Sequence, residues 1–158
     1  QKPIDAWRLL IDEGCLRHII SCTEEFAQRT VPTWTVSESE MDSFVGLLYL
    51  RGAMNQNNFP CDVLWSSEYG CKAFPATMSR DRFQDIKRCI RFDVHSTRRE
   101  RLQSDKFALI SSLFNRFVEN SQKCYVPTWS VTVDEQLFPT KSRCKFTQYM
   151  SNKPDFYD

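Results

Sequence analysis

Apolar residues recur at the three- and four-residue spacing of an amphipathic helix through most of this chain. The glycine-containing stretch 12–14 is predicted to break the first helix, while 59–78 and 93–103 are expected to be irregular. Ser37 and Glu40 form a capping-box pattern at the start of the second helix, which we expect to be the most buried. The spacing predicts four helices in all, over residues 3–29, 37–54, 78–90 and 104–121.

The pattern changes near residue 130, where an alternation with a period of two replaces the helical spacing. Residues 130–136 and 144–150 are short and rich in β-branched or aromatic side chains. This predicts two strands joined by a connection over residues 137–143. We therefore expect a mainly α fold that ends in a short C-terminal β-hairpin.

Composition and charge limit the class of protein. With 158 residues, 41% of them hydrophobic, the chain can bury a core, so wholesale disorder is excluded. No apolar run is long enough to cross a bilayer, so no membrane partner is expected. The 21 Lys and Arg residues nearly balance 20 Asp and Glu, so only local charge can indicate a partner. The 7 cysteines show no C-x-x-C spacing and only 2 histidines accompany them, which favours buried thiols over a zinc site or a disulfide framework.

Asp134 is the most informative single residue, because it lies in the middle of a predicted strand among apolar neighbours. An ionised carboxylate in such a place needs a partner, a hydrogen bond or a metal ion. Carboxylates suit Mg²⁺, and enzymes that cleave phosphodiesters use several of them to hold two ions. The alternative is an aspartate on the solvent face of an edge strand. The pattern alone leaves both open.

Two groups of basic residues are candidates for contacts with the DNA backbone. Positive side chains on one helix could bind phosphates without regard to sequence, but interleaved acidic residues also suit an ordinary solvated face. Positive side chains close to Asp134 could hold a phosphodiester near a metal, or they could protect an edge hairpin from aggregation. The first group is Arg80, Arg82, Lys87, Arg88 and Arg91, followed by Arg98, Arg99 and Arg101, and the second is Lys141, Arg143 and Lys145.

Several motifs, taken together, resemble the piggyBac transposase family over nearly the whole chain, from about residue 3 to 154. Residues 130–137 (SVTVDEQL), with Arg143-Cys144 and residues 148–154 (QYMSNKP), are similar to the region around the family's first catalytic aspartate. Upstream motifs match the same family in the same order: residues 78–86 (MSRDRFQDI), Arg91-Phe92-Asp93 and Asp105-Lys106.

The resemblance implies cut-and-paste transposition at TTAA target sites, with transposon terminal inverted repeats as the DNA partner. It also implies a homodimer, a nuclear location and a catalytic domain of RNase H-like fold that binds Mg²⁺ through three aspartates. Residues 1–128 would be a helical dimerisation and DNA-binding region, and residues 129–158 would be the first two strands of the catalytic domain. Only the first catalytic aspartate can be placed on this sequence, at Asp134.

The sequence ends 24 residues after Asp134, and one carboxylate cannot hold two metal ions. We therefore expect that this chain alone neither cleaves nor joins DNA. Two other hypotheses stay open: a transposon-derived protein kept only to bind DNA or a protein partner, and a remnant without function.

Overall fold

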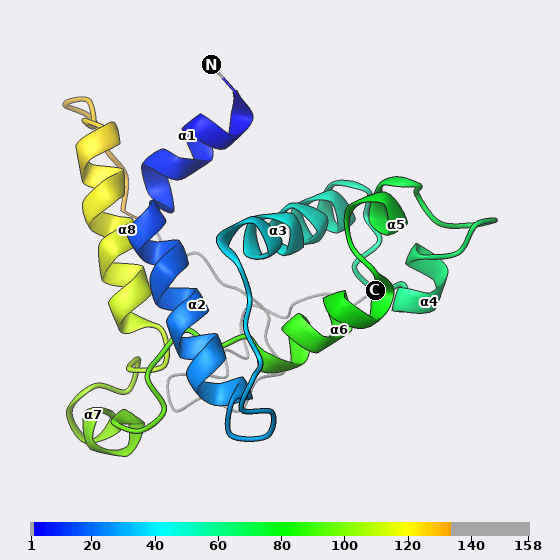
Figure 1. Cartoon of the computed structure of the whole chain (residues 1–158). Helices are drawn as coiled ribbons and strands as arrows, with labels where there is room; N and C mark the ends of the chain where they lie inside the picture. The colour runs from blue at the N-terminus through cyan, green and yellow to red at the C-terminus, as the bar shows by residue number, and fades with distance from the viewer. Residues whose placement is uncertain (1, 134–158) are drawn as a thin grey trace, which may run out of the picture.

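The structure, a computed structural model, describes residues 2–133. Over this range the regular elements are eight α-helices, and there is no strand (Figure 1). None of the helices in this part of the chain is long and apolar enough to span a membrane. The helices are α1 (Pro3–Leu10), α2 (Glu13–Ala27), α3 (Glu38–Ala53), α4 (Cys61–Leu64), α5 (Ala73–Thr77), α6 (Arg80–Cys89), α7 (Arg98–Ser104) and α8 (Ser111–Cys124).

The predicted fold class, mainly α with a C-terminal β-hairpin, is wrong for the residues that the structure describes. Residues 130–133, the first half of the expected first strand, have no regular secondary structure. Val131 and Val133 are exposed by 67% and 96%, so neither packs on a core. Alternation of side chains makes a strand only when a neighbouring strand takes up its backbone hydrogen bonds. Residues 134–158, which include the rest of the expected hairpin, lie outside the described residues.

The helix starts follow the capping chemistry of the sequence. Ser37 Oγ accepts a hydrogen bond from Glu40 N at 3.1 Å, and a Glu40 carboxylate oxygen accepts one from Ser37 N at 3.1 Å, so the predicted capping box at the start of α3 is confirmed. The predicted break in the first helix is also found, because Asp12 caps α2 by accepting from Cys15 N at 2.8 Å. Gly14 lies within α2, so the cap and not the glycine separates the two helices.

Two other expectations from the sequence are wrong. The segments 59–78 and 93–103 are not wholly irregular, because the first contains α4 and α5 and the second contains most of α7. The most buried helix is α2, which buries six residues, whereas α3 buries three. The reason is position: α2 lies between α8 on one side and α3 and α6 on the other (Figure 1), so it is covered from several directions.

An aromatic cluster joins α3, α4, α5 and α6 in the core. The ring of Phe83 lies 5.0 Å from that of Phe44 and 4.9 Å from that of Trp65, measured between centroids. Trp65 in turn lies 5.1 Å from Phe74 and donates from its indole nitrogen to Met78 O at 2.8 Å. Such tilted pairs add specific geometry to a large buried apolar area. The cluster therefore fixes how α6 lies on the remainder of the core.

Candidate nucleic-acid interface

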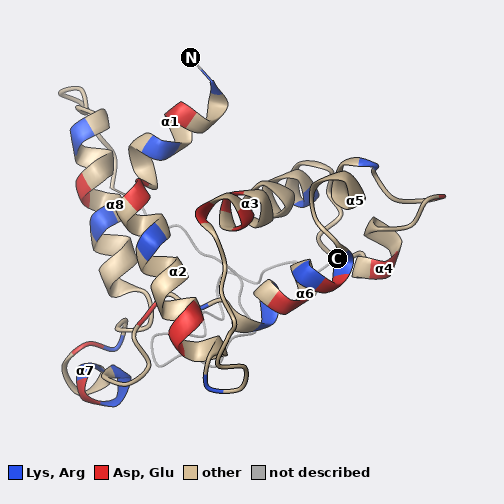
Figure 2. Cartoon of the chain, in the orientation of Figure 1, with Lys and Arg blue, Asp and Glu red and all other residues tan. Residues whose placement is uncertain are grey.

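Helix α6 carries four of the basic residues that are candidates for DNA contacts, Arg80, Arg82, Lys87 and Arg88. Ser79 caps its first turn by accepting from Arg82 N at 3.3 Å, and Phe83 and Ile86 are completely buried. With these two residues facing the core, the charged side chains are left on the remaining sides of the helix. Positive and negative residues alternate along the ribbon of α6 (Figure 2). The number of cations available to a partner therefore depends on which ones are already paired.

Arg82 is engaged within the protein. Its Nε donates to Glu40 at 2.9 Å, its Nη2 donates to Thr35 O at 2.6 Å, and its guanidinium lies 4.9 Å from the centre of the Trp34 ring. The hydrogen bond from Arg82 is the largest of the influences that lower the pKa of Glu40, although burial of that carboxyl acts against it. Arg82 therefore joins α6 to the start of α3.

Arg80 is also paired, although it lies on the surface. Its Nη1 donates to Asp62 at 2.7 Å, and its Nη2 donates to Asp81 at 3.0 Å. Two carboxylates around one guanidinium leave this end of α6 without excess positive charge. Neither Arg80 nor Arg82 is therefore a strong candidate for a phosphate contact.

Lys87 and Arg88 differ from these two residues. Lys87 is exposed and makes no ion pair with any residue in the range 2–133. Arg88 is 77% exposed, and the carboxylate of Asp85 that approaches it lies 3.6 Å away. That carboxylate already accepts a hydrogen bond from Trp34 Nε1 at 2.6 Å. The last turn of α6 thus presents two cations to solvent.

Arg91 follows α6 and has an unusual environment. Its guanidinium carbon lies 3.5 Å from the centre of the Phe26 ring, and its Nη1 donates to Arg88 O at 3.1 Å and to Ile90 O at 2.6 Å. Burial lowers the pKa of Arg91, and the nearby positive charge of Arg98 lowers it further. Arg91 makes no ion pair with a carboxylate of the described part of the chain.

Sequence reasoning missed the role of Asp93, which is 4% exposed. Its carboxylate accepts from Arg98 at 2.7 Å and 3.0 Å, and from Arg101 at 2.8 Å. Arg101 also donates to the carbonyls of Val94 and Ala108, at 2.8 Å and 2.6 Å. Burial acts to raise the pKa of Asp93, but hydrogen bonds from the two arginines outweigh it and the pKa is lowered. Two arginines three residues apart, just after the Arg-Phe-Asp motif, were the signal that could have indicated this cluster.

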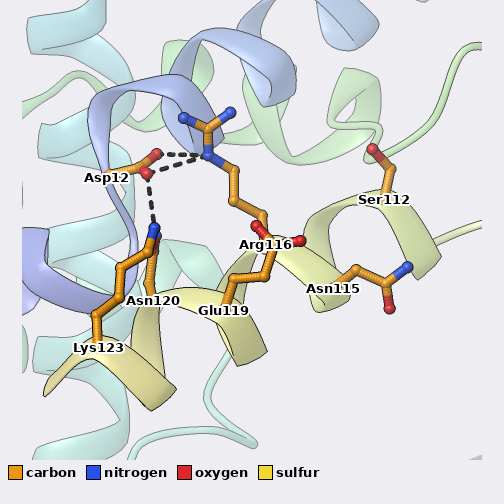
Figure 3. Close-up of a pocket in the computed structure, with 7 residues that line it drawn as sticks. All are labelled: Asp12, Ser112, Asn115, Arg116, Glu119, Asn120 and Lys123. Atoms are coloured by element: carbon orange, nitrogen blue, oxygen red, sulfur yellow. Dashed lines mark hydrogen bonds and ion pairs between the residues drawn. The ribbon is translucent and has the colours of Figure 1, made fainter.

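A polar hollow of about 550 Å³ lies where α8 meets the start of α2 (Figure 3). Arg116 Nε donates to Asp12 at 3.0 Å, and Asn120 Nδ2 donates to the same carboxylate at 3.0 Å. Although burial opposes the shift, these bonds and the Cys15 amide hold the pKa of Asp12 well below its usual range. Gly14 leaves room for the Arg116 guanidinium, which a Cβ at that position would meet. Asp12, Arg116 and Asn120 bind one another at this hollow, so it acts as a joint between helices.

The remaining predicted site residues, Asp134, Lys141, Arg143 and Lys145, lie outside the described residues, so their contacts stay predictions. Within residues 2–133, no group of three or more His, Cys, Asp or Glu side chains could hold a metal ion. The assignment of Asp134 as a Mg²⁺ ligand therefore stays a prediction.

Comparison with known proteins gives a consistent result. The family model described as Transposase IS4 matches residues 2–157. A solved structure, described as the cryo-EM structure of a piggyBac transposase synaptic complex with hairpin DNA, is similar with a TM-score of 0.89 and 26% sequence identity. The match covers 97% of this chain and 33% of that chain, so the protein spans about a third of the transposase. No curated protein matches the sequence.

Proposed function

Because the chain belongs to the Transposase IS4 family, whose model matches residues 2–157, we propose that it serves as the DNA-binding helical part of a piggyBac-type transposase. The observation that carries this proposal is the similarity, at a TM-score of 0.89, to a transposase solved with DNA. Both comparisons name transposases, which favours this function over a binding protein kept without catalysis.

The contact with DNA is made, in this proposal, by the last turn of α6. Both Lys87 and Arg88 are exposed there; Lys87 has no ion-pair partner within the described residues, and Arg88 has only Asp85, at 3.6 Å. Phosphate contacts from such side chains give an affinity that is independent of DNA sequence. This affinity falls as the salt concentration rises, because the release of counterions from the DNA then favours binding less. The net charge of +1 does not oppose this, because acidic residues near α6 are already paired, Asp62 with Arg80 and Glu40 with Arg82.

The proposal extends to catalysis by the whole transposase. Residues 129–158 would begin its catalytic part, with Asp134 as a ligand for the Mg²⁺ that supports phosphodiester hydrolysis and strand transfer. Lys141, Arg143 and Lys145 would lie near the cleaved strand. A homodimer acting in the nucleus on terminal inverted repeats and TTAA targets belongs to the same proposal. Its support is the resemblance of residues 130–154 to the piggyBac family.

Binding of a fluorescently labelled duplex, followed by anisotropy in increasing KCl, tests the DNA contact. The chain is expected to bind, and the double variant K87A/R88A should reduce the slope of log affinity against log salt by about 2, one for each lost phosphate contact. The control is the double variant R17A/K72A, which removes the same charge from α2 and from the residue before α5. Equal slopes for both double variants would contradict the assignment to α6, and no binding by the wild-type chain would contradict the function.

A further inference from the structure

We propose that Arg91 receives one phosphate group of the DNA backbone at the place where the ends of α2 and α6 meet. This inference rests on the proposed DNA-binding function and adds a defined site to it, beyond the exposed cations of α6. Three observations support it: the fixed position of Arg91, its lack of an acidic partner among residues 2–133, and the positive charge of Arg98 nearby.

The segment that follows α6 is tied to α2 through its backbone. Arg91 N donates to Thr23 Oγ1 at 3.1 Å, and Phe92 O lies 2.9 Å from His18 Nε2. The Phe26 ring supports the guanidinium of Arg91 from one side, at 3.5 Å from ring centre to guanidinium carbon. These contacts hold the Arg91 side chain in one place, so little ordering is required when a ligand arrives.

The donors of Arg91 are only partly used. Nη1 donates to two backbone carbonyls at the end of α6, whereas Nε and Nη2 have no acceptor in the described part of the chain. A guanidinium presents its donors in a planar fork that matches the oxygens of a phosphate group. A partly buried fork that has no carboxylate partner among residues 2–133 can therefore receive an anion.

The charged groups around Arg91 also favour an anionic ligand. The nearby carboxylate of Asp93 is bound by Arg98 and Arg101, and that of Glu25 by Arg29, so neither forms an ion pair with Arg91. Arg98 also lies near enough to lower the pKa of Arg91, after the larger effect of burial. Like charges near each other repel, and a phosphate bound at Arg91 relieves that repulsion.

Variants at Arg91 test the inference in the same anisotropy experiment. R91M should weaken duplex binding roughly tenfold at about 0.1 M KCl and reduce the salt slope by about 1. R91K keeps the charge without the fork, so it should retain the slope and bind with intermediate affinity. R17M removes one positive charge from the exposed surface of α2 and serves as the matched control. If the wild-type chain binds while R91M keeps both its affinity and its slope, this inference is wrong and the proposed function stands.

A second measurement does not depend on how the variants fold. In ¹H–¹⁵N NMR spectra of the wild-type chain, the Arg91 Nε–H signal should shift when the duplex is added, but not with inorganic phosphate at the same phosphate concentration. A shift with inorganic phosphate alone would overturn the assignment to DNA. No shift with either probe would overturn the site itself, and absence of all DNA binding would overturn the proposed function together with it.

Discussion

The arginines near α6 show how far the surroundings of a residue decide its role. Arg82 and Arg101 use their donors on carboxylates and carbonyls of the protein, and they hold neighbouring segments together. Arg88 meets only the Asp85 carboxylate, at 3.6 Å, and Arg91 has no carboxylate partner among the described residues. The sequence identifies all of these residues as basic, but it does not contain the partners, because Glu40 lies 42 residues before Arg82. Pairing across the fold therefore had to be seen in the structure.

Asp93 gives a test at this scale. D93N removes the charge that two arginines bind while keeping the shape of the side chain, so we expect it to lower the free energy of unfolding by about 2 kcal/mol at neutral pH. The folded-state pKa of Asp93 is below its ordinary value of 3.8. Its contribution is therefore fully present above pH 3.8 and is lost as the pH falls through the lower, folded-state pKa.

Urea denaturation of the wild type and D93N at several pH values measures this contribution. The difference between the two proteins should be largest near neutral pH and should shrink below about pH 4, since protonated aspartic acid resembles asparagine. A difference that is independent of pH, or no difference at neutral pH, would contradict the role assigned to the Asp93 carboxylate.

Among the helices and the contacts between them, the sequence predicts correctly those features that depend on residues close together in the chain. The capping box of Ser37 and the aspartate cap of α2 are local, and both elements begin where that chemistry places them. The expected strand over residues 130–136 depends on a partner strand, and its described half is not a strand. Helix α7 was missed because its polar sequence has no apolar stripe, while its Arg101 binds four groups elsewhere in the chain segment 93–108.

The joint between α8 and the α1–α2 connection offers a test at the scale of elements. Asn120 is 6% exposed, and its Nδ2 donates to Leu10 O at 3.2 Å and to Asp12 at 3.0 Å. N120A should lower the free energy of unfolding by about 1–2 kcal/mol, because it removes the donor from the half-buried Leu10 carbonyl and from Asp12. N115A changes an exposed asparagine of the same helix and should stay within about 0.5 kcal/mol of the wild type. Equal effects of the two variants in thermal unfolding would contradict the role of this joint.

At the scale of the whole molecule, two regions of polar side chains differ in how far their charges are paired. At the joint of α2 and α8 the polar groups satisfy one another, which suits a structural contact. At the ends of α2 and α6 positive charge exceeds the negative charge that binds it, which suits an anionic partner. The family match and the similarity to a transposase bound to DNA agree with a partner of that kind.

Hydrogen–deuterium exchange of the full chain, with and without duplex DNA, tests this division most directly. The account predicts that DNA slows exchange in the peptides that cover the last turn of α6 and residues 90–99, and leaves α4 and the α8 surface near Arg116 unchanged. Slower exchange confined to α8 or α4, with none at the end of α6, would contradict it.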